Sequence, residues 1–343
     1  MTRSKKTVTS SDVARMAGVS RSAVSRTYTK GASISEKTRA RVIEAAESLG
    51  YRPNAMARSL ITRTSGIIGL VMADLSNPFY GEVLETLSEK LQQMDLHVLL
   101  FSVSRAHDID DALPALLQYQ VDGVIITSAI LTSEMARRCT RAGRPVVLFN
   151  RYVADNSIST VCTDNIAGGR MIADLMVKTG RRRLAFMAGT EDTSTSNDRQ
   201  AGFYGRIQEL GIDAPLFDRG DYSYEGGVEA ARRLLGHHPR PDALFCANDM
   251  MALAALDVAR TELGLDVPGD LAIAGFDDIP QAGWMNNSIT TIHQDIEAMT
   301  TATIDILIER VKKPDVLPLR KTIPGKLVVR STCPATVTPS NPG

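Results

Sequence analysis

From Gly66 onward the chain alternates short apolar runs with longer amphipathic stretches, and this alternation limits the possible folds more than any other feature. The apolar runs are rich in β-branched residues and have the length of strands, whereas the stretches between them repeat apolar residues at helical spacing. Such alternation predicts α/β architecture, with parallel sheets that helices cover on both faces. We expect strands at Ile67–Ala73, Leu96–Val103, Gly123–Thr127, Val146–Asn150, Leu184–Ala188, Ala243–Ala247 and Leu271–Gly275, and helices at Tyr80–Met94, Ala167–Thr179, Gln200–Leu210, Tyr224–Leu235 and Met250–Leu263.

The length of 343 residues exceeds what one hydrophobic core normally supports, so we expect more than one domain. The strand–helix units fit two doubly wound subdomains better than one, with ligand bound in the crevice between them at the carboxyl ends of the strands. The predicted division is a head at 1–62, a body at 63–333 and a flexible tail at 334–343. Within the body we expect an N-subdomain at about 66–163 and 293–320 and a C-subdomain at about 164–290 and 321–333.

The net charge of zero hides an asymmetry between the head and the rest of the chain. Residues 1–62 contain 12 Lys and Arg against 4 Asp and Glu, which leaves 27 basic and 35 acidic residues elsewhere. Only the N-terminal segment therefore suits a polyanion such as DNA.

The head has helical periodicity and no strand-like run, so we expect three short helices. Ser10 or Ser11 is expected to cap a helix that starts at Asp12 and ends near Gly18. Ser20 is expected to cap the second helix, and a third helix follows Ser35 and ends at Gly50. This is a helix-turn-helix pattern, and it exposes Arg21, Ser22, Ser25 and Arg26 at the start of the second helix, where such helices contact base edges.

The stretches Ser11–Arg26, Ser35–Arg39 and Gly50–Leu60 resemble the DNA-binding domain of the lactose, galactose and purine repressor family. The resemblance implies a base-reading pair at Arg21 and Ser22 and a hinge helix at 54–60 that places Leu60 into the minor groove. The full set of expected DNA contacts is Ser11, Ser20, Arg21, Ser22, Ser25, Arg26, Asn54, Ala57 and Leu60. The alternative is a merely solvated basic surface with Leu60 packed inside.

The body resembles the same family, and the periplasmic sugar-binding proteins, over nearly its whole length. The matching stretches are Gly69–Tyr80, Thr163–Gly169, Arg199–Phe203, Cys246–Asp249, Gly275–Asp278 and Thr290–Gln294. The resemblance implies that Asp164, Thr195, Arg199, Asn248 and Asp277 make polar contacts with one ligand. Phe79, Tyr222 and Trp284 are candidates for the flat apolar surface on which a sugar ring stacks.

Each of these side chains also has a purely structural alternative. Asp164, Asn248 and Asp277 are possible helix caps, and Arg199 is a possible structural ion pair. The three aromatic residues are possible core residues. One arginine among carboxylates favours a neutral sugar, a polyol or a singly charged sugar acid. Thr193 stands where purine-binding relatives carry a second arginine, which argues against a purine.

The sequence lacks the glycine-rich nucleotide loops and the nucleophile turn of doubly wound enzymes, so we expect a binding protein without a cofactor. A transport protein would lack the DNA-binding head. The four cysteines are too far apart for a zinc site, and we expect reduced thiols. No run has the length of a membrane span. We therefore expect a cytoplasmic transcription repressor that binds a pseudo-palindromic operator and a carbohydrate-like effector as a homodimer. A dimer is favoured over a tetramer because the C-terminus lacks leucine heptads.

Overall fold

The structure, a computed structural model, describes residues 8–29, 31–52, 64–103, 114, 116–127, 139, 141–153, 157–191 and 193–336. The chain forms two compact units, Met1–Ser65 and Gly66–Gly343, which we call the head and the body. The hinge helix expected at 54–60 lies outside the described residues, as does the expected tail from residue 337 onward. Both stay predictions.

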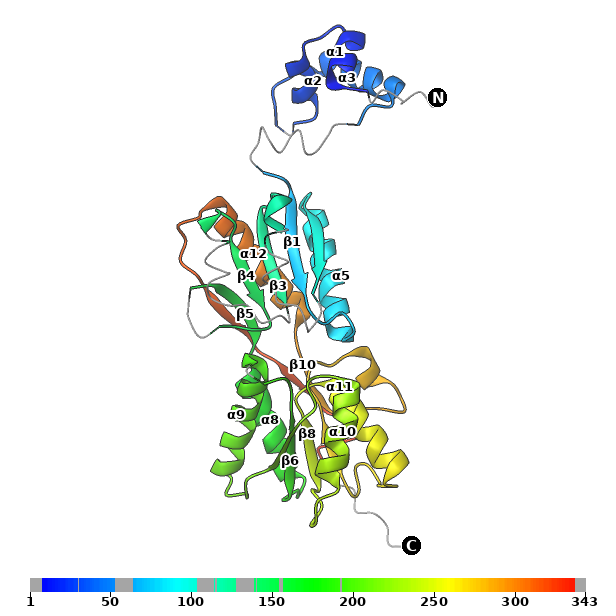
Figure 1. Ribbon diagram of the computed structural model, residues 1–343, viewed down its shortest axis with the longest axis vertical. Helices are drawn as coiled ribbons and strands as arrows, with labels where there is room; N and C mark the ends of the chain where they lie inside the picture. The colour runs from blue at the N-terminus through cyan, green and yellow to red at the C-terminus, as the bar shows by residue number, and fades with distance from the viewer. Residues whose placement is uncertain are drawn as a thin grey trace. The chain divides into compact units, whose positions relative to one another are not determined.

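In the part of the head that the structure describes, three helices, α1 (Ser10–Ala17), α2 (Arg21–Thr27) and α3 (Glu36–Leu49), are present (Figure 1). They surround a small apolar core. Val13, Val24 and Val42 are almost completely buried at its centre. The predicted caps of the second and third helices are confirmed: the Ser20 hydroxyl accepts from the amide of Ala23, and the Ser35 hydroxyl accepts from that of Thr38. These bonds satisfy amides that the first helical turn leaves unpaired.

The predicted start of the first helix is wrong by two residues. Helix α1 begins at Ser10 with Thr9 as its N-cap, rather than at Asp12. The physical reason is the Asp12 carboxylate, which accepts hydrogen bonds from the backbone amide and the hydroxyl of Thr9 at 3.0 and 2.7 Å. Asp12 thus acts as the acidic partner three residues after the cap. The helix ends as expected at Gly18, whose φ of 63° is left-handed.

The first lobe of the body is a parallel six-stranded sheet in the order β11-β5-β4-β3-β1-β2. Helices α5 (Pro78–Gln93) and α12 (Ile296–Lys312) pack against each other beside this sheet (Figure 1). The inner strands are apolar and buried along their length, as expected for parallel strands between two layers. The strands are β1 (Ile67–Met72), β2 (His97–Ser102), β3 (Gly123–Thr127), β4 (Val146–Phe149), β5 (Ser159–Thr163) and β11 (Arg320–Ile323).

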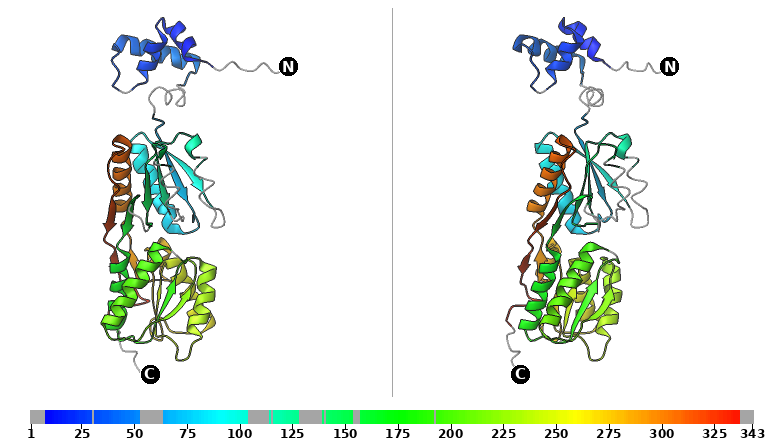
Figure 2. Two further views of the ribbon diagram at one scale, coloured as in Figure 1. Left: turned by 60° about the vertical axis from the view of Figure 1, so that its left-hand side comes forward. Right: turned by 90° about the vertical axis from the view of Figure 1, so that its left-hand side faces the viewer.

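The second lobe is a parallel four-stranded sheet in the order β7-β6-β8-β9. Helices α8 (Asn165–Lys178) and α9 (Ser194–Glu209) cover one face, and α10 (Tyr224–Leu235) and α11 (Asp249–Asp257) cover the other (Figures 1 and 2). A π-helical turn at Val258–Glu262 extends α11, and a 3-10 turn spans Pro280–Gly283. The strands are β6 (Leu184–Ala188), β7 (Leu216–Arg219), β8 (Ala243–Cys246) and β9 (Ala272–Ala274).

Three segments connect the lobes. They are the passage from β5 to α8, the strand β10 (Thr291–His293) that precedes α12, and the passage from β11 to β12 (Lys326–Val328). The Asp164 amide donates to the Ile323 carbonyl at 2.8 Å and so ties two of these segments together. Strand β11 pairs with β5 as far as Ile323, so the first sheet extends past the boundary expected at residue 320.

The expected α/β fold with two doubly wound parts is confirmed, and all seven expected strands are present. Five further strands, β5, β7, β10, β11 and β12, were not anticipated. They are short and carry polar or charged residues: β11 reads Arg-Lys-Thr-Ile and β5 reads Ser-Thr-Val-Cys-Thr. Their pairing with neighbouring strands, rather than their own apolar pattern, fixes them as strands.

Candidate functional site

The start of helix α2 presents a polar and basic surface. Ser20, Arg21, Ser22, Ser25 and Arg26 are all exposed, whereas Val24 and Thr27 face the core. The hydroxyls of Ser20 and Ser22 lie 2.8 Å apart. Exposed arginine side chains near the start of a second helix are suited to contact phosphates and base edges.

The other expected DNA contacts divide into two groups. Ser11 is half-buried in the first turn of α1 and is not the helix cap. Asn54, Ala57 and Leu60 lie outside the described residues. The surface that the structure describes is therefore the one around α2.

The body contains a cavity between its two lobes. Its lining residues come from loops that follow strands and from the first two turns of helices, which is where doubly wound sheets place their ligands. The first lobe contributes Asp74, Asn77, Tyr80, Asn150 and Arg151, and the second contributes Thr195, Arg199, Tyr222 and Asp277. Four of the eight predicted ligand contacts are thus brought together here.

Arg199 is only 2% exposed, and its guanidinium group makes several contacts within the cavity wall. Its Nε donates to the Asn165 side-chain oxygen at 2.8 Å, and its Nη1 donates to the Ala247 carbonyl. Its Nη2 lies 3.5 Å from the Asp277 carboxylate, and the guanidinium carbon lies 3.6 Å from the centroid of the Phe276 ring. These contacts fix the orientation of the guanidinium group before any ligand arrives.

Asp277 carries the second charge of the wall that the second lobe forms. Burial raises the pKa of this carboxyl to about 6, while Arg199, Gln294 and Asn77 act in the opposite direction. The Gln294 amide donates to it at 2.7 Å. Its φ of 121° is unusual for a residue with a side chain, and such backbone conformations gather at binding sites.

Thr195 and Tyr222 form a hydroxyl pair in the same wall. Their oxygens lie 2.9 Å apart, and both side chains are buried. The Tyr222 ring occupies the space beside Gly189, where a Cβ would lie 2.1 Å from a ring carbon. Gly189 is therefore required for the observed position of the tyrosine.

The wall formed by the first lobe holds buried polar atoms of a different kind. The side-chain oxygen of Asn150 and the Nε of Arg151 are buried and have no hydrogen-bond partner among the described residues. Asn150 has a left-handed φ of 62°. An unpaired buried polar atom destabilises a protein by about 1–3 kcal/mol, so a ligand that supplies a donor for Asn150 and an acceptor for Arg151 gains this energy. A hydroxyl group can do both.

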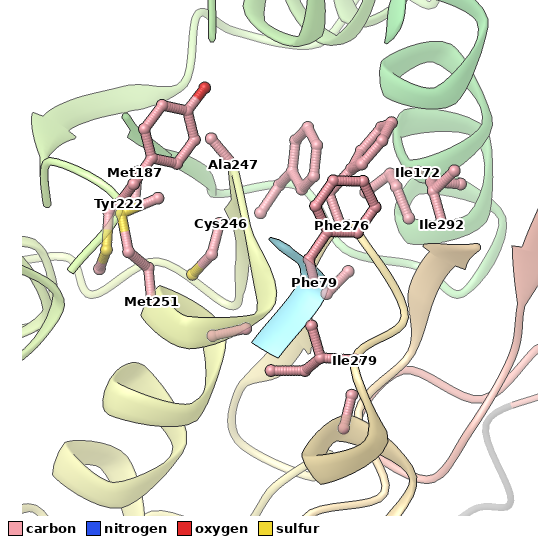
Figure 3. Packing of buried hydrophobic residues seen from close by; sticks show 14 of the residues in the cluster. Phe79, Ile172, Met187, Tyr222, Cys246, Ala247, Met251, Phe276, Ile279 and Ile292 are labelled. Atoms are coloured by element: carbon pink, nitrogen blue, oxygen red, sulfur yellow. The ribbon is translucent and has the colours of Figure 1, made fainter. Parts of the chain in front are cut away.

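The structure does not bring four of the predicted contacts to this cavity. Phe79 is 1% exposed and belongs to the apolar core, where Figure 3 shows it close to Phe276. Its neighbour Tyr80 lines the cavity instead, because one residue turns the side chain by about 100° around a helix. Trp284 is 58% exposed and is not among the lining residues.

Asp164 and Asn248 take their structural alternatives. Asp164 caps α8 by accepting from the Ala167 amide at 2.9 Å, and Asn248 caps α11 by accepting from the Met251 amide at 3.0 Å. Asn248 also donates to the Tyr222 carbonyl at 3.2 Å, so it supports the cavity wall from behind.

Sequence reasoning missed five lining residues: Asp74, Asn77, Tyr80, Asn150 and Arg151. A signal was available for three of them, because Asp74 and Arg151 directly follow predicted strands and Tyr80 begins a predicted helix. Asn150 was assigned to the end of a strand, and Arg151 was overlooked. No cluster of three or more His, Cys, Asp or Glu side chains able to hold a metal ion occurs in the described part of the chain. Among the described helices, none has the length and apolar character needed to cross a membrane.

A helix-turn-helix head joined to a two-lobed α/β body with a polar cavity defines a class of ligand-responsive regulators, and comparisons with known proteins agree. Residues 9–54 match the family described as bacterial regulatory proteins, lacI family, and residues 173–333 match the periplasmic binding protein-like domain. The ribose operon repressor of Halalkalibacterium halodurans is 33% identical over 94% of this chain and 96% of its own length.

Two solved structures are similar over nearly the whole chain. The transcriptional regulator CelR in complex with cellobiose has a TM-score of 0.73 and 31% identity, covering 95% of this chain and 99% of the other. The lac repressor dimer bound to operator and the anti-inducer ONPF has a TM-score of 0.86 and 28% identity, covering 96% and 100%. The chain belongs to the lacI family of bacterial regulatory proteins, and it is a DNA-binding regulator of transcription.

Proposed function

We propose that this protein is a repressor whose affinity for a pseudo-palindromic operator is controlled by a sugar, a polyol or a sugar acid bound in the cavity. It acts in the cytoplasm, where bacterial DNA lies. The observation that carries the proposal is the cavity that both lobes line, where the Asn150 oxygen and the Arg151 Nε have no hydrogen-bond partner among the described residues. The same chain exposes two arginines on helix α2 of its head. A polyhydroxylated ligand satisfies donors and acceptors side by side.

Several features of the cavity favour a carbohydrate-like effector. Tyr80 and Tyr222 contribute aromatic side chains to the lining, and the polar groups include both charged pairs and neutral hydroxyls. The lining contains two arginines and two aspartates, so positive and negative side chains are equal in number, which disfavours a multiply charged phosphate as the ligand. Relatives named for ribose and crystallised with cellobiose support the same class.

We further propose that the protein acts as a homodimer, because two identical heads read the two halves of a palindrome. Strand β2 lies at one end of the six-stranded sheet, and its Leu100 is 38% exposed. Trp284 and Met285 are 58% and 97% exposed. Apolar side chains at a sheet edge and on a surface turn are suited to be covered by a second copy. The lac repressor relative is a dimer on its operator.

The DNA-contacting set stays as the sequence predicts it: Ser11, Ser20, Arg21, Ser22, Ser25 and Arg26 in the head and Asn54, Ala57 and Leu60 in the hinge helix. Replacing Leu60 by serine is expected to weaken specific binding more than nonspecific binding, because an apolar wedge bends only a site that deforms easily. Equal loss on both kinds of DNA would refute the wedge.

The proposal is tested by selecting random duplexes on the purified protein, with and without a panel that contains D-ribose, cellobiose and simple sugar acids. Recovery of a palindrome whose yield changes with the panel is the expected result, and dividing the panel identifies the effector. Recovery of a palindrome that no sugar affects would refute the carbohydrate assignment but leave DNA binding intact. Heat from hypoxanthine or guanine alone in calorimetry would point to a purine instead.

A further inference from the structure

A second set of contacts joins the two lobes beside the cavity. Tyr152 directly follows the lining residues Asn150 and Arg151 in the first lobe. Its hydroxyl donates to the Asp198 carboxylate of α9, in the second lobe, at 2.7 Å. Its backbone amide donates to the Ser194 hydroxyl on the same helix at 3.1 Å. One tyrosine therefore bonds twice across the gap between the lobes.

Arg320 fixes this tyrosine on the side of the first lobe. The guanidinium carbon lies 3.6 Å from the centroid of the Tyr152 ring, within the range of a cation–π contact. Arg320 is the first residue of β11, which pairs with β5 and continues into a segment that connects the lobes. We call Tyr152, Asp198, Ser194 and Arg320 the interlobe bridge.

The bridge involves the same segments that line the cavity. Asp198 and Ser194 directly precede Arg199 and Thr195 along α9, and Tyr152 directly follows Arg151. The three connecting segments allow the lobes to rotate about one side, as in hinged binding proteins. A bond between Tyr152 and α9 opposes that rotation, because opening the lobes would separate these atoms.

The chemistry of the central bond favours a strong contact. A hydroxyl that donates to a carboxylate forms a charge-assisted bond, which is stronger than one between neutral groups. Burial raises the pKa of Tyr152, with the Asp198 bond adding to this effect, so the hydroxyl keeps its proton at neutral pH. Burial also raises the pKa of Asp198, while the Tyr152 bond lowers it.

We propose that Tyr152 is a positioning residue, whose bond to Asp198 holds the two walls of the cavity at the spacing that the effector requires. Tyr152 is not among the residues that line the cavity, so it sets effector affinity without contacting the effector. The apparent affinity for the effector is the intrinsic affinity multiplied by the fraction of molecules in the closed arrangement. Loss of the bond therefore lowers the affinity by the same factor as it lowers that fraction. The effect on effector affinity rests on the proposed function, whereas the effect on lobe spacing does not.

The first test uses no ligand. Spin labels are placed at Glu89→Cys on α5 and Gln208→Cys on α9, which are exposed positions in different lobes. The four native cysteines are buried, which favours selective labelling. Double electron–electron resonance is expected to show a broader distribution with longer distances in Tyr152→Phe than in the parent. An unchanged distribution would overturn the proposal.

The second lobe provides a matched control. The Tyr224 hydroxyl donates to the Asp257 carboxylate at 2.6 Å, and both residues lie in the same lobe. Tyr224→Phe removes the same kind of bond and is expected to leave the distance distribution unchanged. Asp198→Asn keeps an acceptor and is expected to stay near the parent, whereas Asp198→Ala is expected to behave like Tyr152→Phe. The double variant Tyr152→Phe with Asp198→Ala is expected to be no worse than either single change, because both remove one bond.

The binding test uses D-ribose or cellobiose, whichever the parent protein binds in calorimetry. Tyr152→Phe is expected to weaken that affinity roughly three- to tenfold, and Tyr224→Phe is expected to leave it unchanged. An unchanged affinity in Tyr152→Phe would overturn the positioning role even if the lobes open. If the parent binds neither sugar, the carbohydrate assignment loses support, while the distance measurement still decides whether the bridge holds the lobes.

Discussion

The two walls of the cavity differ in how their polar groups are bonded. In the second lobe, Arg199 contacts Asn165, Ala247 and Asp277, and Thr195 pairs with Tyr222. In the first lobe, the Asn150 oxygen and the Arg151 Nε are buried without a partner among the described residues. One wall is therefore organised in advance, and the other has bonding capacity to offer.

This difference indicates how the effector can couple to the arrangement of the lobes. A ligand that contacts the wall of the second lobe gains little binding energy from rearranging that wall, because its side chains are already bonded to one another. It gains most when the first lobe approaches and its unpaired atoms find partners. Such a gain exists only in the closed arrangement, which is the differential affinity that an allosteric ligand needs.

The largest expected effect is that of Arg199→Met. This change leaves the Asp277 carboxylate buried without its cation, and it should lower the free energy of unfolding of the body by about 3–5 kcal/mol. Effector binding should fall at least about a hundredfold, since more than one bond is lost. Urea denaturation and calorimetry measure the two effects. Arg170→Met, which breaks the exposed pair with Glu209, is the control and should change stability by less than about 1 kcal/mol.

A pH dependence follows from Asp277, a buried carboxyl group of the organised wall. Because burial raises its pKa to about 6, the folded state binds the proton more tightly than the unfolded state does. Protonation of Asp277 therefore stabilises the folded state at low pH. This contribution to the free energy of unfolding, at most about 3 kcal/mol, is lost as the pH rises from about 4 to about 6. The free energy of unfolding, measured at several pH values, should fall less steeply in Asp277→Asn. Equal slopes in both proteins would contradict this account.

Arg151→Met tests the unpaired wall. Because the buried Arg151 Nε has no hydrogen-bond partner among the described residues, stability should stay the same or rise slightly, while effector affinity should fall by about tenfold or more. Measuring both quantities on one sample separates the two walls. A loss of stability as large as that of Arg199→Met would mean that the walls do not differ.

The smallest expected effect is that of Tyr222→Phe, which removes the bond to Thr195 but keeps the ring. Stability should fall by about 0.5–1.5 kcal/mol, and effector affinity should fall by no more than a few-fold. Thr195→Val, which removes the partner hydroxyl, should reproduce this result. A much larger loss in the phenylalanine variant would show that the Tyr222 hydroxyl contacts the effector directly.

The elements fixed by local chemistry were predictable from the sequence. Ser20, Ser35 and Gly50 act as caps because hydroxyl acceptors and a left-handed glycine serve this purpose wherever a helix begins or ends. The first helix was misplaced because three candidate caps, Thr9, Ser10 and Ser11, follow one another. The choice among them depends on the reach of the Asp12 carboxylate.

The cavity was only half predictable, because the same residue types serve two purposes at the end of a parallel strand. Asp164 and Asn248 have the polar side chains that a ligand site needs, but both accept hydrogen bonds from backbone amides in the first turn of the helix that follows them. Whether Phe79 or Tyr80 lines the cavity depends on the rotation of α5 about its axis, and the packing of the core sets that rotation. Arg151 directly follows the strand predicted at Val146–Asn150, so its place at the end of that strand could be recognised from the sequence.

The most direct test of the account compares the operator affinity of the parent protein and of Arg151→Met by fluorescence anisotropy, with and without the effector found by selection. The account predicts that the effector changes the affinity of the parent by at least about fivefold, a coupling of about 1 kcal/mol. The variant should bind the operator equally well without effector and should need about ten times more effector for the same change. An effector response that is identical in both proteins would contradict control through this cavity.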